Sequence, residues 1–215
     1  MDELISKKID NFFTKHKPQS FKKGEILIRA DDNPTGIFYL KEGIVKKYAI
    51  SKKGDELTVN LFKPISFFPV SWAINGSSNS YFYEALTDLK VWKALPESVN
   101  EFIKTNPDVL YDLLSRVYKG TDGMLTRMTY LMAGNAYARL LTEIIIQAKR
   151  FGKKTDGGIE IKISEKDLAS QSGMTRETVS REIKVLKDKG FASFNKNILV
   201  IRNIEELEKE LLEGV

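Results

Sequence analysis

The sequence predicts an α+β protein in which an antiparallel β-rich region comes first, a long helical region follows, and a small mixed domain ends the chain. Three observations support this order. Residues 21–93 contain short β-rich runs that alternate with turn residues. Residues 108–150 repeat apolar side chains at spacings of three and four, which is typical of a helix. Residues 163–191 contain two capped helical stretches separated by a glycine.

The composition limits the classes of function that the chain can have. It has 215 residues, one His and no Cys, which excludes disulfides and cysteine-ligated iron–sulfur clusters. His16 alone cannot supply the several ligands of a metal site, so we expect a surface histidine and no metal or other cofactor. No run of about 18 apolar residues and no signal-peptide pattern is present, so we expect a cytoplasmic protein with no membrane partner. The net charge of +5 permits a nucleic-acid partner without establishing one.

The first predicted domain covers residues 1–106 and is rich in β-structure. An amphipathic helix is expected over about residues 1–17, and a short helix over 97–106. Between them lie six β-rich runs bounded by turn residues: 25–29, 36–40, 44–50, 57–62, 81–86 and 89–95. Several short strands at roughly regular spacing favour an antiparallel double-sheet barrel, the β jelly roll.

The second predicted domain, residues 107–150, is a long dimerisation helix. Its apolar residues recur at spacings of three and four from Leu110 to Ile145, as in a coiled-coil seam. We expect two copies of this helix to pair in a homodimer; the alternative is a helix that packs only on its own barrel. Three glycines mark hinges, a break in the helix or close helix contacts: Gly120, Gly123 and Gly134.

The third predicted domain covers residues 151–215 and contains two helices in tandem. Ser164 is a suitable N-cap with Asp167 three residues later, which predicts the start of the first helix. Gly173 fits its end, because glycine readily adopts positive φ. Thr175 then caps a second helix.

Strands flank these two helices. A short strand over 159–163 precedes them, and a hairpin over 192–201 follows with turn residues at its tip, where Lys196 lies. A turn-rich link over 151–158 comes before, and an acidic helix over 205–213 comes last. This order is that of a winged helix-turn-helix.

The second helix has a polar face suited to DNA. Arg176, Glu177, Ser180 and Arg181 lie opposite its apolar stripe and within its first two turns. Arg can donate two hydrogen bonds to guanine, and Glu can accept one from the amino group of cytosine. The first turns of such a helix reach base edges in the major groove. The alternative is an ordinary pair of amphipathic helices with solvated charges.

Three stretches resemble one family. T-R-E-T-V-S-R-E-I-K-V-L at residues 175–186 closely resembles the recognition helix of the cAMP-receptor/FNR (CRP/FNR) family of bacterial transcription regulators. F-x-K-G-E-x-L at 21–27 and I-F-Y-L-x-x-G-x-V at 37–45 resemble the start of that family's cyclic-nucleotide-binding jelly roll. The resemblance covers both ends of the chain, and it implies a homodimeric transcription regulator that is not an enzyme.

The resemblance also implies roles for residues. Arg176 and Arg181 are expected to read guanines, Glu177 a cytosine or adenine amino group, and Ser180 a thymine or a phosphate. Four residues are expected to contact DNA phosphates, with a solvated turn lysine as the alternative for the last: Ser164, Thr175, Thr178 and Lys196. The expected partners are palindromic double-stranded DNA with half-sites akin to TGTGA or TTGA, a second copy of the chain, and RNA polymerase.

The region expected to hold the effector departs from the family. In cAMP-binding members an F-x-G-E step and a following Arg-Ser pair hold the cyclic phosphate and the ribose. When Phe67 and Phe68 are aligned with that step, Pro69 replaces the Gly and Val70 replaces the Glu, and residues 79–80 are Asn-Ser. Residues 66–84 contain no Lys or Arg, although a phosphate needs a cation. We therefore expect no useful affinity for cAMP or cGMP.

Aromatic residues take the place of these polar groups. They make a candidate effector pocket: Phe67, Phe68, Trp72, Tyr81 and Tyr83. Such a lining favours an apolar or aromatic small molecule of unknown identity. The alternative is that these side chains fill the barrel, so that the amount of protein in the cell sets its activity.

A different class of protein is also compatible with this organisation. It is a small-molecule-binding sensor whose winged helix makes protein contacts rather than DNA contacts. An enzyme is not supported, because the chain has one His, no Cys and no glycine-rich phosphate loop.

Overall fold

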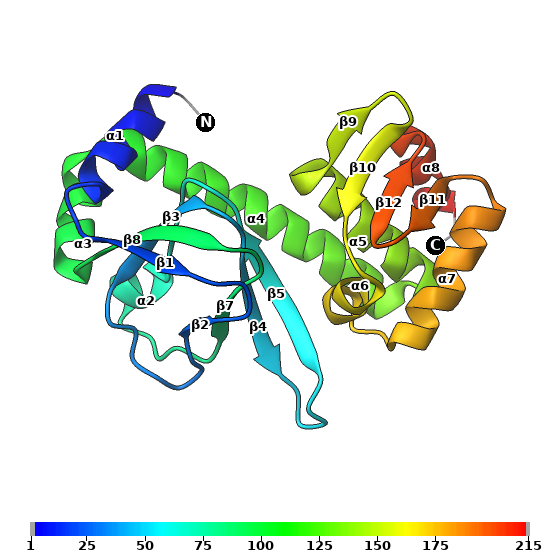
Figure 1. The fold of residues 1–215 in the computed structure, drawn as a ribbon, viewed down its shortest axis with the longest axis horizontal. Helices are drawn as coiled ribbons and strands as arrows, with labels where there is room; N and C mark the ends of the chain where they lie inside the picture. The colour runs from blue at the N-terminus through cyan, green and yellow to red at the C-terminus, as the bar shows by residue number, and fades with distance from the viewer. Residues whose placement is uncertain (1–2, 214–215) are drawn as a thin grey trace. The chain divides into compact units, whose positions relative to one another are not determined.

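The structure is a computed structural model that describes residues 3–213, so Met1 and Asp2 of the expected first helix lie outside the described residues. The chain forms two compact units, Met1–Val117 and Tyr118–Val215 (Figure 1). Eight strands and three helices belong to the first unit, together with the start of α4 (Pro107–Ala133). They are α1 (Glu3–Phe13), β1 (Pro18–Phe21), β2 (Ile26–Ile28), β3 (Ile37–Glu42), β4 (Val45–Ile50), β5 (Glu56–Phe62), β6 (Ser66–Phe68), α2 (Val70–Asn75), β7 (Phe82–Ala85), β8 (Leu89–Ala94) and α3 (Pro96–Thr105).

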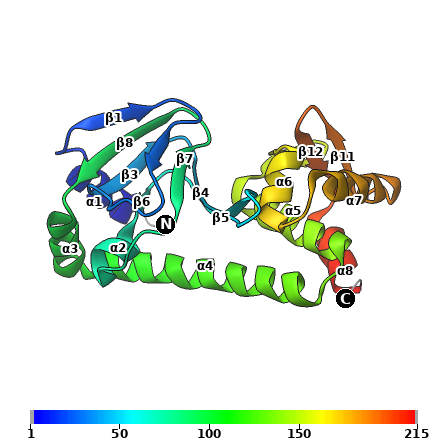
Figure 2. The same ribbon diagram turned by 90° about the horizontal axis from the view of Figure 1, so that it is seen from below.

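The first unit is a barrel of two four-stranded antiparallel sheets, which confirms the predicted jelly roll. Their strand orders are β1-β8-β3-β6 and β2-β7-β4-β5. Successive residues of a strand face opposite sides of a sheet. Phe38 and Leu40 of β3 therefore pack into the barrel, against Val45 and other residues of the second sheet. Ile37 and Tyr39 face the other way and pack against α1 and α3. Figure 2 shows α2, α3 and the first turns of α4 on one side of this barrel.

All six predicted strands are present, and two further strands were missed. The missed strands are β1 and β6, which have four and three residues. Both are bounded by proline, since Pro18 begins β1 and Pro69 follows β6. Proline cannot donate a backbone hydrogen bond and usually indicates a break in a strand. Short strands next to a proline are therefore difficult to predict from the sequence.

The long helix expected from Asp108 to Arg150 is two helices, α4 and α5 (Ala136–Phe151). Gly120 and Gly123 do not break α4, which continues through both. The break comes at Asn135, whose ψ of 179° is extended and whose side chain accepts a hydrogen bond from the N–H of Ala138. An N-cap of this kind starts a new helix. The part of the expected seam that lies in α5 is instead buried in the core of the second unit.

The second unit joins α5 to a small sheet and three more helices. Its elements are β9 (Lys153–Thr155), β10 (Gly158–Lys162), α6 (Glu165–Ser172), α7 (Arg176–Asp188), β11 (Ala192–Asn195), β12 (Ile198–Ile201) and α8 (Ile204–Glu213). The sheet order is β11-β12-β10-β9. β9 was missed, because a turn-rich link was expected there. The hairpin of β11 and β12 is confirmed, and its tip residues Lys196 and Asn197 have the positive φ values of a tight hairpin turn. The predicted winged helix-turn-helix is therefore present.

No helix of residues 3–213 combines the length and apolar character that a membrane span requires.

Candidate nucleic-acid interface

The first helix of the pair, α6, has the predicted caps at both ends. Ser164 Oγ accepts a hydrogen bond from the N–H of Asp167 at 3.1 Å, and Asp167 Oδ2 accepts one from the N–H of Ser164 at 3.1 Å. This reciprocal capping box satisfies two backbone donors that the helix leaves unpaired. Gly173 ends α6 with φ 65°, a left-handed conformation that glycine adopts without strain. The caps fix where the turn between α6 and α7 begins.

The second helix, α7, starts at the predicted residue and buries the predicted face. Thr175 Oγ1 accepts a hydrogen bond from the N–H of Thr178 at 3.2 Å. Val179, Ile183 and Leu186 are buried in the core of the second unit. The register of α7 is therefore set by an N-cap at one end and by an apolar stripe on one side, which leaves its opposite face in solvent.

Two buried contacts hold α5 in place beneath this pair of helices. Gln147 Nε2 of α5 donates a hydrogen bond of 2.7 Å to Gln171 Oε1 of α6, and both residues are buried. Glu143 of α5 is 1% exposed and forms a bidentate ion pair with Arg127 of α4. Burial raises the pKa of Glu143 despite the Arg127 guanidinium. Polar contacts of α5 therefore stabilise the second unit in addition to its apolar core.

The four residues expected to read bases all lie exposed on the same face of α7. Arg176, Glu177, Ser180 and Arg181 lie within its first two turns. The backbone N–H of Glu177 and the Thr175 hydroxyl stabilise the Glu177 carboxylate, which holds its pKa below the ordinary value. The side chain of Glu177 is therefore an acceptor at neutral pH.

Each arginine that is expected to read a base has a carboxylate partner. Arg176 Nε lies 3.1 Å from Glu165 Oε2 at the start of α6, and Arg181 Nε lies 3.1 Å from Glu182 Oε1. The arginine side chains are 71% and 69% exposed, so these pairs are weak and can be exchanged for other acceptors. Glu165 was not singled out in the sequence, because its contact with Arg176 spans the turn between two helices.

Two neighbouring hollows line the exposed side of α7. One, of about 770 Å³, is bordered by all four expected reading residues. The other, of about 390 Å³, brings Ser164 and Lys196 together with Arg176. Phe194 of the hairpin borders both hollows. The expected phosphate contacts Thr175 and Thr178 lie instead at the N-terminus of α7.

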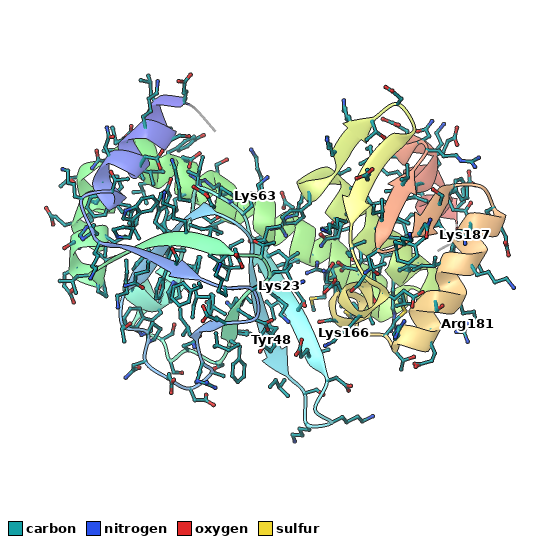
Figure 3. All side chains as sticks on the ribbon, viewed as in Figure 1. Lys23, Tyr48, Lys63, Lys166, Arg181 and Lys187 are labelled. Atoms are coloured by element: carbon teal, nitrogen blue, oxygen red, sulfur yellow. The ribbon has the colours of Figure 1, made fainter. Side chains whose placement is uncertain are left out.

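Three further lysines border these hollows and were not predicted as site residues. Lys184 and Lys187 lie on α7, and Lys166 lies on α6. Figure 3 shows Arg181 and Lys187 along the same helix and Lys166 on α6. The sequence contained this information, because Lys184 is four residues after Ser180 and Lys187 is three residues after Lys184, so all three share one face of the helix. Six cationic and two acidic side chains border the two hollows, which makes the surface positive.

The aromatic residues expected to form one effector pocket belong to two different cores. Phe68 and Tyr83 lie inside the barrel, where their rings stack at 5.4 Å, and Tyr81 packs at the edge of the same core. Phe67 and Trp72 lie with α1 and α3 on the other side of the sheet. Phe67 and Phe68 are neighbours in a strand and so face opposite ways. The five side chains therefore do not line one site.

A lysine from a strand outside residues 66–84 contacts two of these aromatic rings. Lys47 of β4 pairs across the sheet with Tyr83 of β7. Its Nζ lies 4.0 Å from the ring centre of Tyr81 and 5.7 Å from that of Tyr83. The observation that residues 66–84 carry no Lys or Arg is correct, but it did not account for this neighbouring strand.

Two family models match most of the chain. The model of the cyclic nucleotide-binding domain matches residues 18–106, and that of the Crp-like helix-turn-helix domain matches residues 137–210. The chain is 26% identical over 200 residues to the global nitrogen regulator of Nostoc sp. (strain PCC 7120), covering 89% of this chain and 88% of that protein. It is 26% identical over 201 residues to the transcriptional regulator SdrP of Thermus thermophilus, covering 91% and 96%.

Solved structures have the same fold. A transcriptional regulator of the CRP/FNR family from Thermus thermophilus superposes with a TM-score of 0.73 at 25% identity, covering 92% of this chain and 98% of that one. A CooA mutant from Carboxydothermus hydrogenoformans superposes with a TM-score of 0.79 at 19% identity, covering 94% and 90%. At that lower identity the likeness concerns the fold alone.

Proposed function

Because the chain belongs to the CRP/FNR family of transcription regulators, we propose that it binds a palindromic promoter site as a dimer in the cytoplasm and does so without cAMP. One observation carries the DNA-binding part. Arg176, Glu177, Ser180 and Arg181 lie together on the exposed face of a helix whose start is fixed by the Thr175 cap. Donors and acceptors in the first turns of such a helix suit base edges in the major groove.

The proposed roles follow from chemistry and position. Arg176 and Arg181 donate to guanine, Glu177 accepts from a cytosine or adenine amino group, and Ser180 contacts a thymine or a phosphate. Lys196, at the tip of the hairpin, contacts a phosphate. The hydroxyls of Ser164 and Thr175 cap α6 and α7, and the Thr178 hydroxyl lies 3.1 Å from that of Thr175. Each hydroxyl can form a further hydrogen bond, and we propose that a DNA phosphate accepts it.

Selection from a random duplex library at about 0.15 M ionic strength tests the DNA-binding part. We expect an enriched palindrome with half-sites related to TGTGA or TTGA, whose centres lie about 34 Å apart. The Arg181→Ala variant is the matched control, and it should enrich a sequence with one fewer specified base pair in each half-site. Failure of the wild-type chain to enrich any sequence would favour the alternative, a sensor whose winged helix contacts proteins.

Dimerisation is supported by an apolar seam along α4. Positions 110, 114, 117, 121, 124, 128 and 131 alternate spacings of four and three, as in a heptad repeat. Six of them are apolar and exposed: Leu110, Leu114, Val117, Met124, Met128 and Leu131. An exposed row of apolar side chains of this length is typical of a helix that pairs with another helix. Leu114→Glu together with Met128→Glu should yield a monomer by analytical ultracentrifugation, whereas Lys119→Glu should not.

Absence of cAMP binding is supported by the side chains at the turn after β6. Pro69 and Val70 stand where a glycine and a ribose-binding carboxylate are expected, and Asn79 uses its side chain to bind the backbone of Arg29 and Tyr81. Calorimetric titration with cAMP should give no heat beyond dilution. Micromolar affinity would contradict this part of the proposal and leave the DNA-binding part intact.

A further inference from the structure

The last turns of α4 carry two surfaces side by side. Met124, Met128 and Leu131 belong to the exposed seam that is proposed for dimerisation. Beside this seam, Arg127 bonds to α5 and Tyr130 packs against the core of the second unit. All of these residues belong to that unit. The contacts between α4 and α5 therefore set the orientation of the winged helix relative to this part of the seam.

The turn between α4 and α5 has a closely defined backbone. A Cβ atom on Gly134 would lie 2.7 Å from the carbonyl oxygen of Tyr130 and 3.2 Å from the Cβ atom of Ala138, so a side chain has no room there. Arg139 Nε donates a hydrogen bond of 3.3 Å to the carbonyl oxygen of Gly134. A small change of a backbone angle at this turn would still move the far end of α5 substantially. A contact farther from the turn is needed to hold the angle between the two helices.

The ion pair of Arg127 and Glu143 is such a contact. Each residue lies about two helical turns or more from Gly134, on opposite sides of it. Arg127 Nε donates to Glu143 Oε1, and Arg127 Nη2 donates to Glu143 Oε2 at 2.9 Å. The side chains are 18% and 1% exposed. A bidentate pair of a planar guanidinium and a carboxylate has a defined geometry, so it favours one orientation of α4 relative to α5.

A second directional contact extends this connection to the helix-turn-helix. Gln147 lies four residues after Glu143 and so shares its face of α5. Its side chain donates the buried 2.7 Å hydrogen bond to Gln171 of α6, and Gln171 lies two residues before Gly173, which ends α6. Buried polar contacts with defined directions therefore run from the seam helix to the turn that precedes α7.

The stability of the second unit does not by itself account for the ion pair. The desolvation of two charges offsets much of their attraction, and apolar residues of similar volume are often as stabilising in such a position. Apolar burial, however, is non-directional. What the pair of Arg127 and Glu143 adds to the apolar core is therefore a preferred orientation of the two helices.

We propose that Arg127 and Glu143 are positioning residues that determine which spacing between two half-sites the dimer recognises. This role rests on the proposed function, because it requires a dimer that pairs through α4 and binds palindromic DNA. In such a dimer the angle between α4 and α5 sets the distance between the two copies of α7, and the half-sites must match that distance. The pair acts through the position of α7 and does not read bases.

A set of duplexes with identical half-sites and different spacings tests this role. One or two base pairs are added or removed between the half-sites of the selected palindrome, and one further duplex carries a single half-site. Fluorescence anisotropy should show that the wild type binds the selected spacing about tenfold or more tightly than the altered spacings. A wild-type chain that binds no palindrome would refute the proposed function, and with it the role of the pair.

On a chain that does bind a palindrome, a double variant tests the pair itself. Arg127→Met together with Glu143→Leu replaces both charges with apolar side chains, which avoids leaving one charge buried alone. The preference for the selected spacing should fall about fivefold, the order expected for a change in a buried network that links two sites. Affinity for the single half-site should not change. An unchanged spacing preference would overturn the proposal.

The matched control removes a different ion pair of α5. Lys149 and Glu208 join α5 to α8, with Nζ 2.5 Å from Oε1. Lys149→Met together with Glu208→Leu makes the same changes of charge without touching the contact to α4, and it should keep the wild-type spacing preference. An equal loss of spacing preference in this control would overturn the proposal.

A second variant keeps the carboxylate. The Arg150 guanidinium also stabilises the charge of Glu143, so the thermal unfolding midpoint of each variant is measured as well. Arg127→Lys retains the positive charge and loses the bidentate geometry, and it should lose part of the spacing preference while its affinity for the single half-site is unchanged. A merely structural role predicts a lower midpoint and equally weakened binding to all duplexes, and that result in both variants would overturn the proposal.

Discussion

The exposed face of α7 and the inner face of β4 both carry polar groups that the fold does not use, but they do so in different ways. On α7 the groups lie in solvent, and Arg176 and Arg181 each have a weak carboxylate partner that they can exchange for another acceptor. On β4 the ammonium group of Lys47 lies against the rings of Tyr81 and Tyr83, and no carboxylate of residues 3–213 forms an ion pair with it. The polar groups on α7 remain hydrated, so their exposure costs little free energy. The ammonium group of Lys47 is partly desolvated, which is unfavourable for a charge.

This difference is the one expected between a surface that binds DNA and a site that binds a small molecule. DNA is large and presents many base edges, so an exposed row of donors and acceptors suffices and solvent screens the unbound state. A small ligand must be enclosed, so its recognition depends on the packing of the barrel itself. Substitutions on the exposed face of α7 should therefore change binding and leave the free energy of unfolding unchanged. Substitutions inside the barrel should change both.

The largest effect is expected inside the barrel. Phe68 is 1% exposed and stacks on Phe62 and Tyr83, so Phe68→Ala should lower the free energy of unfolding of the first unit by about 3–5 kcal/mol. Denaturant unfolding measures this loss. Ile50→Ala, at an exposed position of β4, is the control and should stay within about 0.5 kcal/mol of the wild type. A small loss for Phe68→Ala would mean that the barrel does not depend on this packing.

A smaller effect, of a different kind, is expected on α7. Arg181→Ala should cost about 1–3 kcal/mol of binding free energy at the selected site, because a bidentate base contact is lost. Binding to random duplex should fall less, and the unfolding midpoint should not change, since the side chain is exposed. Fluorescence anisotropy with both duplexes measures the difference. Equal losses on both duplexes would show that Arg181 contacts phosphates and not a base.

The hairpin tip should behave as an electrostatic contact. Lys196→Ala should weaken all duplex sequences alike and reduce the slope of log affinity against log salt by about 1. Titrations at several salt concentrations measure the slope. Lys154→Ala, an exposed lysine of β9 in the same unit, is the control for loss of one positive charge. An identical change of slope in both variants would argue against a specific phosphate contact at Lys196.

The smallest effect is expected where one carboxylate orients a reading residue. Glu165→Gln removes the partner of Arg176 and should reduce discrimination at the base pair that Arg176 reads by less than about 1 kcal/mol, as for an exposed ion pair. The same substitution in an Arg176→Ala background should have no effect on that discrimination. A double-mutant cycle measured on matched and mismatched duplexes tests this, and a coupling of zero would remove Glu165 from the interface.

The exposed face of α7 could be predicted from the sequence because a helix is a local structure. The caps at Ser164, Gly173 and Thr175 and the stripe at Val179 and Ile183 fix which side chains are exposed without reference to any distant residue. The ion pair with Glu165 lay beyond such reasoning, because it depends on the angle of the turn between two helices.

For the barrel, the sequence predicted the fold but not which side chains contact one another in its interior. The jelly roll followed from the spacing of the β-rich runs, but strand pairing decides which aromatic residues meet. Alternation along β6 shows that Phe67 and Phe68 face opposite sides, and only the packed sheets show which of them is inside. Lys47 was missed because its neighbour Tyr83 is 36 positions away and is brought to it by the pairing of β4 with β7.

The opposite facing of Lys46 and Lys47 also makes β4 intolerant of misalignment during folding. A slip of β4 by one residue would turn every one of its side chains to the other side of the sheet. Lys46 would leave Glu56 and Glu84, and the core residue Val45 would be exposed to water. Both faces of the sheet would then lose stabilising contacts. The shifted pairing of β4 is therefore less stable than the observed pairing, and the two lysines contribute to that difference.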